Sequence, residues 1–155
     1  MNNFSNRVFT NADQEVMQYD GQAVSWRVSA YALIVQEDSI LIIKNRNEKL
    51  YDVPGGGIEF GESIEEALER ELMEEAGAKA AIGNIIHVEQ GFFKHGNGNF
   101  YQTIQMFYSA KLVGELVEAT EGTTEFVGFV KFDELEKYPL PKAAKAAVAK
   151  LKGFL

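Results

Sequence analysis

Residues 54–78 read PGGGIEFGESIEEALERELMEEAGA, a glycine-rich loop that runs directly into a helical pattern. Ser63 can cap the helix, and Glu66 three residues later completes a capping box. Gly77 can take the left-handed conformation that ends a helix. Four glycines among residues 55–61 let the loop turn sharply and approach a ligand closely. The buried face of the helix is predicted to hold Ile64, Ala67, Leu68 and Leu72.

The same unit carries most of the negative charge of the chain. The formal charge of the whole chain is −8, and residues 59–75 contain eight glutamates and one arginine. Helical spacing puts Glu71 and Glu75 on one face with Glu74 on its flank, where like charges destabilise a helix by about 0.2–0.5 kcal/mol per pair. A solvated acidic face is one interpretation. A bound hard cation, Mg²⁺ or Mn²⁺, is the other, because convergent carboxylates are its preferred ligands.

Outward from this unit, the sequence predicts strands on both sides of the helix. The β-type runs cover residues 24–35, 39–44, 82–93, 100–113 and 126–132. The first two runs suit a hairpin, and the consecutive apolar residues Ile40 to Ile43 indicate a strand covered on both faces. A second helix is predicted from about Pro141 to Lys152, with a buried face of Ala144, Val148 and Leu151. This order favours an α/β fold in which a mixed β-sheet is sandwiched between helices.

The composition is that of one ordinary globular domain. The chain has 155 residues, 46% hydrophobic and 25% charged, without repeats or a linker, so a single domain over residues 1–155 is predicted. The absence of cysteine excludes a disulfide framework, a thiolate metal site and a cysteine nucleophile. The acidic balance argues against binding to nucleic acid or to an anionic membrane, and no apolar run is long enough to span a membrane. A cytoplasmic protein is therefore expected.

Residues 56–78 fit the pattern G-x5-E-x7-R-E-U-x-E-E-x-G-U, in which U is a bulky aliphatic residue. The matching positions are Gly56, Glu62, Arg70, Glu71, Leu72, Glu74, Glu75 and Gly77. The stretch resembles the signature of the Nudix hydrolase family, and a chance match to so many fixed residues is negligible. One position departs from the pattern, because Ala78 stands where the family has a larger aliphatic residue.

The resemblance implies a single Nudix hydrolase domain with a mixed sheet between helices. It implies hydrolysis, dependent on Mg²⁺ or Mn²⁺, of the pyrophosphate linkage in a nucleoside diphosphate joined to another moiety, X. By position in the motif, the residues implied as metal ligands are Glu71, Glu74, Glu75 and the backbone carbonyl of Gly56. Glu74 would also take part in catalysis. Arg70 and Glu62 would orient these carboxylates, and a surface ion pair is the alternative for Arg70.

Residues outside the motif complete the predicted site. Glu121 is the first candidate for a general base or an extra ligand, with Glu125 or a glutamate of the motif as the alternative. Arg46 is the first candidate for binding substrate phosphates, followed by Lys44, and Tyr51 is a candidate for stacking on a base. Solvated loop charges and ordinary aromatic packing are the alternatives at these positions.

A second hypothesis has a different function on the same fold. In this hypothesis the protein is a non-catalytic Nudix-fold module with a nucleotide-binding or regulatory role. Isomerases of prenyl diphosphates share the fold, but the resemblance there implies a catalytic cysteine, which this chain lacks. In the leading hypothesis the partner is a small nucleotide-type substrate. A homodimer through the C-terminal helix or the N-terminal arm is a further hypothesis.

Overall fold

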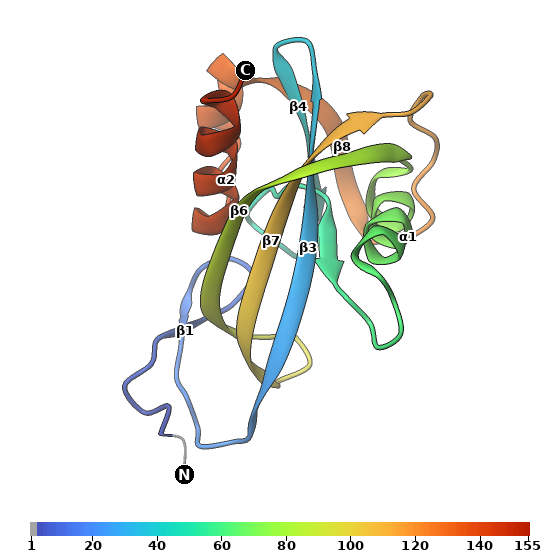
Figure 1. Cartoon of the computed structure of the whole chain (residues 1–155). Coiled ribbons are helices and arrows are strands. Elements are labelled where there is room, and N and C mark those ends of the chain that lie inside the picture. The colour runs from blue at the N-terminus through green and yellow to red at the C-terminus, as the bar shows by residue number, and fades with distance from the viewer. Residues whose placement is uncertain (1–2) are drawn as a thin grey trace.

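The computed structural model describes residues 3–155 as a mixed sheet with a helix on either side (Figure 1). The strands run in the order β2-β1-β6-β7-β3-β4-β8, and β5 pairs with β3 off this path. The pairs β3–β7 and β1–β6 are parallel, whereas the other pairs are antiparallel. The α/β architecture with a mixed sheet between helices, predicted from the sequence, is confirmed.

The elements are β1 (Phe9–Thr10), β2 (Val16–Met17), β3 (Val24–Gln36), β4 (Ser39–Asn45), β5 (Gly55–Gly57), α1 (Ile64–Ala76), β6 (Ala80–Lys94), β7 (Phe100–Leu112), β8 (Thr124–Lys131), the 3-10 helix η1 (Phe132–Lys137) and α2 (Lys142–Lys152). All five predicted strands and both predicted helices are present, with ends within two residues of the prediction. The short elements β1, β2, β5 and η1 were missed, because two to six residues give no readable periodicity.

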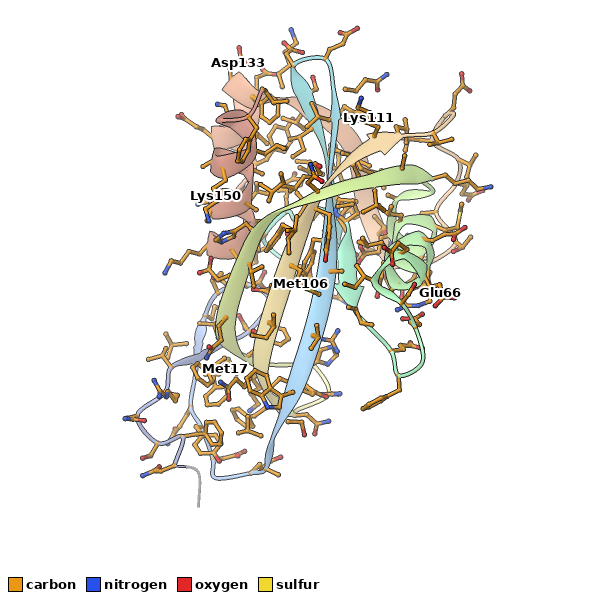
Figure 2. All side chains as sticks on the ribbon, in the orientation of Figure 1. Met17, Glu66, Met106, Lys111, Asp133 and Lys150 are labelled. Carbon is orange, nitrogen blue, oxygen red and sulfur yellow. The ribbon has the colours of Figure 1, made fainter. Side chains whose placement is uncertain are left out.

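Strand β4, next to the edge strand β8, is covered on both faces, because its side chains alternate between two apolar cores. Ile40 and Ile42 pack with α2, whereas Leu41 and Ile43 pack with α1. Each of these four residues is at most 2% exposed. Glu66 on α1 and Lys150 on α2 mark the opposite sides of the sheet (Figure 2). The predicted strand covered on both faces is confirmed.

Helix α1 begins and ends at the predicted residues. The Ser63 hydroxyl accepts the Glu66 N–H, and the Glu66 carboxylate accepts the Ser63 N–H, which is the predicted capping box. Gly77 ends the helix with φ of 57°, and a Cβ there would lie 1.9 Å from the Val117 carbonyl oxygen. Glycine is therefore required both by the backbone angle and by the close packing. Ala78 is buried in the core under α1, so the smaller residue fits its place.

The N-terminal arm, residues 3–23, packs against the lower end of the sheet (Figure 1). Phe9 is fully buried there, among rings of the arm and of strands β6 and β7. Its ring contacts are Phe4, Tyr19, Phe92 and Phe100. Within residues 3–155, no helix is both long enough and apolar enough to cross a membrane. The cytoplasmic location and the homodimer stay predictions.

Candidate active site

The glycine loop is held against the sheet and against helix α1 at the same time. Gly55, Gly56 and Gly57 form β5, which pairs antiparallel with residues 29–31 of β3. A Cβ on Gly55 would lie 2.3 Å from the Ala30 carbonyl oxygen, and a Cβ on Gly56 would lie 2.6 Å from Oε1 of Glu71. Only glycine fits at position 55, where the neighbour is backbone, and glycine at position 56 leaves the Glu71 carboxylate its place beside the loop.

Glu75 is a partly buried carboxylate whose hydrogen-bond donor is the Gly55 backbone N–H, at 3.0 Å. Burial, together with the nearby carboxylates of Glu71, Asp52 and Glu121, raises the pKa of Glu75 to about 9. The Gly55 N–H lowers it in part. No lysine or arginine within residues 3–155 forms a salt bridge with Glu75. An anion at this position therefore needs a cation from outside the chain.

Glu71 and Glu74 lie beside Glu75 but differ in exposure. The side chain of Glu71 is 14% exposed and that of Glu74 is 37% exposed. Burial raises the pKa of Glu71, while the adjacent Arg70 opposes the shift. The side chains of Glu71, Glu74 and Glu75 line one cleft together with Gly56. The four residues that the motif implies as metal ligands are therefore neighbours in space.

Arg70 connects the helix to the loop that precedes it. Its guanidinium donates to the Glu62 carboxylate at 2.7 and 3.0 Å, to the Gly57 carbonyl oxygen at 3.0 Å and to Glu71 at 2.9 Å. Glu74 lies farther, at 3.4 Å. These bonds hold the pKa of Glu62 at about 2. Glu66, four residues before Arg70, caps the helix, and Arg70 pairs with Glu62 instead.

The cleft has a volume of about 910 Å³ and extends from the glutamates over the sheet. Among the residues predicted outside the motif, Glu121, Arg46 and Tyr51 line it. The backbone N–H of Glu121 donates to the Glu74 carbonyl oxygen at 2.8 Å, which brings this loop to the end of α1. Lys44 does not line the cleft, and its ammonium forms an ion pair with Glu125 at 2.8 Å.

Two residues of the cleft were missed by sequence reasoning. Asp52 lies between the glycine loop and β4, and burial raises its pKa to about 7. The only feature in the sequence that could have pointed to Asp52 is that this acidic residue stands alone next to apolar residues. Arg27 projects from β3 over Gly57, where a Cβ would lie 2.9 Å from its guanidinium carbon. Within residues 3–155 the guanidinium of Arg27 forms no salt bridge, so its charge is open to an anionic ligand.

The donor set of the cleft fits a hard divalent cation. Carboxylate oxygens and a backbone carbonyl are the ligands that Mg²⁺ and Mn²⁺ prefer. The partly buried Glu75, which has no cationic partner within residues 3–155, and the glycine cradle against Glu71 are the two observations that support this fit. Within residues 3–155, no group of three or more histidine, aspartate or glutamate side chains already forms a cage that could hold a metal ion. Mg²⁺ commonly keeps several waters and takes only one or two protein carboxylates, so such a cage is not required.

The comparisons with known proteins agree with this geometry. A family model described as NUDIX domain matches residues 25–151. A putative 8-oxo-dGTP diphosphatase of Bacillus subtilis is 42% identical over 62 residues, which are 39% of this chain and 42% of that protein. An ADP-ribose pyrophosphatase of Methanocaldococcus jannaschii is 26% identical over 115 residues, which cover 72% of this chain and 64% of that protein. The chain thus spans less than two thirds of the length of either curated relative.

The solved structures include a MutT NUDIX hydrolase from Burkholderia pseudomallei. It superposes with a TM-score of 0.66 at 28% identity, covering 81% of this chain and 97% of that one. The family model, the motif and the shared fold all cover the glycine loop and helix α1. The chain is therefore a member of the NUDIX family.

Proposed function

We propose that this protein hydrolyses the pyrophosphate linkage of a nucleoside diphosphate derivative with the help of Mg²⁺ or Mn²⁺. The observation that carries the proposal is Glu75, a partly buried carboxylate with other carboxylates around it and no cationic partner in residues 3–155. Such a group is costly to keep ionised unless a cation binds. The curated relatives named as diphosphatase and pyrophosphatase support the same reaction class.

The residues that would hold the cation are Glu71, Glu74, Glu75 and the Gly56 carbonyl. When bound, a divalent cation supplies charge neutralisation at the pyrophosphate oxygens and acidifies the attacking water. Arg70 and Glu62 fix the rotamer of Glu71 and the position of Gly57 through their shared hydrogen bonds. They act on the ligands of the cation rather than on the substrate.

The proton of the attacking water needs an acceptor within the cleft. The oxygen of the attacking water forms the new bond to phosphorus. The bridging P–O bond breaks, and its electrons stay on the leaving phosphate. The proton of the water passes to a carboxylate. Glu121 is the acceptor that the geometry favours, because it lines the cleft near Glu71 and Glu75. Glu125 is bound to Lys44, and this ion pair lowers its pKa, so it is the weaker base. Glu74 is the second candidate.

Cationic side chains near the glycine loop would bind the substrate phosphates. Arg46, the first candidate from the sequence, lines the cleft, and Arg27 lines it from β3. Lys44 is the weaker candidate because Glu125 already neutralises it. Tyr51 reaches the cleft but packs edge-on against Phe126 and Tyr138, which supports a wall rather than a stacking partner.

The test of this proposal is hydrolysis of a substrate panel by the full chain. The panel contains nucleoside triphosphates, 8-oxo-dGTP, ADP-ribose, dinucleoside polyphosphates and nucleotide sugars, each with Mg²⁺, Mn²⁺ or excess EDTA. We expect release of phosphate or pyrophosphate, or of two nucleotide products, from at least one compound, and none with EDTA. Metal-dependent binding of nucleotide without turnover of any compound would instead support the non-catalytic module.

The glycine loop gives a second expected result. Gly56→Ala adds a Cβ that would lie 2.6 Å from the Glu71 carboxylate, so Glu71 must move away. We expect about a 10- to 100-fold loss of kcat/KM with little change in melting temperature, because the displaced group is a side chain and not backbone. Gly96→Ala is the control, since its Cβ would meet nothing within 4 Å. Equal loss in both variants, or loss in neither, would contradict the role of Gly56.

A further inference from the structure

The floor of the cleft is a polar stretch of three adjacent strands, of which the proposed function uses only Arg27. On β3 and β7, Ser29 stands beside Gln105 and Arg27 stands beside Thr103. On β6, Gly91 is the neighbour of Thr103. All five residues line the cleft. The catalytic glutamates therefore share their cleft with a surface that offers neutral hydrogen-bonding groups.

Two residues of this floor carry hydroxyls that are open to the cleft. Ser29 is 3% exposed and Thr103 is 6% exposed, and both line the cleft. Neither hydroxyl makes a side-chain hydrogen bond within residues 3–155, and neither oxygen is sealed from solvent, so a ligand can bind it in place of water. Gly91 keeps the Thr103 hydroxyl open, because a Cβ there would lie 3.2 Å from its oxygen. The Gln105 amide reaches only the Tyr31 hydroxyl, at 3.5 Å.

The N-terminal arm forms a wall of the same cleft, through Thr10, Asn11, Ala12 and Gln14. These residues precede the stretch 25–151 that the family model matches. Asp13 fastens the arm, since its Oδ1 accepts the backbone N–H of Lys49 at 2.6 Å and of Leu50 at 3.3 Å. Lys49 also forms an ion pair with Glu15. The arm is thus latched to the loop that leads into the glycine loop.

We propose that the Ser29–Thr103 floor and the latched arm form the subsite for the nucleoside half of the substrate. The inference rests on the proposed function and assigns it a specificity element outside the matched domain. A nucleobase is planar and carries several donors and acceptors, so it suits a flat strand surface left bare by Gly91. A second phosphate suits it less, because Glu89 lies beside Gln105 on the floor. Asp13 is a positioning residue, since it holds the wall without lining the cleft.

The floor is tested by binding of two kinds of probe to the full chain with Mg²⁺, measured by titration calorimetry. The first probe is methylenediphosphonate, a pyrophosphate mimic without a nucleoside. The second set comprises the α,β-methylene analogues of ADP, GDP, CDP and UDP. We expect at least one nucleotide analogue to bind more tightly than methylenediphosphonate. Ser29→Ala and Thr103→Val should each reduce this excess affinity about 3- to 10-fold, and leave methylenediphosphonate binding unchanged.

The control is Ser25→Ala, an exposed hydroxyl on the same strand that does not line the cleft. Ser29→Ala keeps the test valid if Thr103→Val fails to fold. Nucleotide analogues that bind no better than methylenediphosphonate, or an excess that survives both substitutions, would overturn the inference and leave the proposed function standing. Absence of binding for every probe, together with no hydrolysis of any compound in the substrate panel, would overturn the proposed function, and the inference with it.

The latch has its own test. Asp13→Ala removes the acceptor of the two loop N–H groups, so the excess affinity for nucleotide should fall and amide exchange at Lys49 and Leu50 should rise. Asp13→Asn keeps an oxygen that can accept the same bonds and should restore both. Asp20→Ala is the control, because this arm carboxylate bonds only to Gln22. Exchange that rises while nucleotide affinity stays at the wild-type value would overturn the role of the arm.

Discussion

Glu75→Gln is expected to lower kcat/KM by at least about 100-fold, whatever nucleotide proves to be the substrate. Substitution of groups that merely support metal ligands costs about 10- to 100-fold, and a direct ligand should cost no less. The glutamine side chain keeps the size of glutamate and an oxygen for the Gly55 N–H, so the loop should remain in place. The loss would therefore report the charge of residue 75 and not the fold.

The same substitution should stabilise the metal-free protein. The pKa of Glu75 in the folded chain is about 9, above the ordinary value of 4.5. The folded protein therefore holds a proton that the unfolded chain releases, and its stability falls as pH rises from about 4.5 to about 9. The stability gain of Glu75→Gln should be small at pH 5 and about 2–4 kcal/mol at pH 9. Mg²⁺ should restore the wild type at high pH and leave the variant unchanged.

The matched control is Glu69→Gln, an exposed glutamate of the same helix that does not line the cleft. It should keep wild-type activity and the wild-type dependence of stability on pH. Kinetics with saturating Mg²⁺ and thermal melts between pH 5 and pH 9 provide the two readouts. Wild-type kcat/KM in Glu75→Gln would refute the assignment of residue 75, and a pH-independent melting temperature in the wild type would refute its raised pKa.

Arg70→Lys is expected to lower activity while leaving stability nearly unchanged. Lysine keeps the positive charge beside Glu62 and Glu71 but lacks the planar fork that reaches Glu62, Glu71 and the Gly57 carbonyl together. We expect kcat/KM to fall about 10- to 100-fold, because Glu71 and the glycine loop lose their shared support. The melting temperature at pH 7 should change little in Arg70→Lys and fall clearly in Arg70→Leu, which leaves these carboxylates unpaired.

Thermal melts at acidic pH test the hydrogen bonds of Arg70 in a second way. The pKa of Glu62 is about 2, below its ordinary value of 4.5, mainly because Arg70 binds it. The stability that this bond contributes is present above pH 4.5 and is lost as pH falls toward 2. Arg70→Leu should flatten this part of the curve, whereas Lys137→Leu, which breaks an exposed ion pair with Glu134, should not. Wild-type kcat/KM in Arg70→Lys would contradict the positioning role.

The elements that the sequence predicted well are those determined by local patterns. Helix α1 carries its own cap, its own stop and a buried stripe within residues 63–77, and the four apolar residues of β4 require cover on both faces. The motif likewise brought Gly56, Glu71 and Glu75 together because a loop and one helix hold all three. Their roles as ligands stay predictions.

The residues that sequence reasoning missed depend on contacts between distant segments. Arg27 reaches the glycine loop only because β3 pairs with β5, and no local pattern marks that pairing. Lys44 is neutralised by Glu125, 81 residues away, through the β4–β8 register. Asp13 meets Lys49 across 36 residues through an arm whose strands have two residues each. Register and arm docking are tertiary properties, so composition and periodicity could not supply them.

The central claim is that Glu75 helps to bind a divalent cation. Mn²⁺ binding measured by electron paramagnetic resonance tests this claim most directly, because the measurement requires no knowledge of the substrate. Free Mn²⁺ is titrated against the wild type, Glu75→Gln and Glu69→Gln at pH 8 in the presence of methylenediphosphonate. The claim predicts that the wild type and Glu69→Gln bind the cation with equal affinity and that Glu75→Gln binds it at least about 10-fold more weakly. Equal binding by all three proteins, or by none, would contradict it.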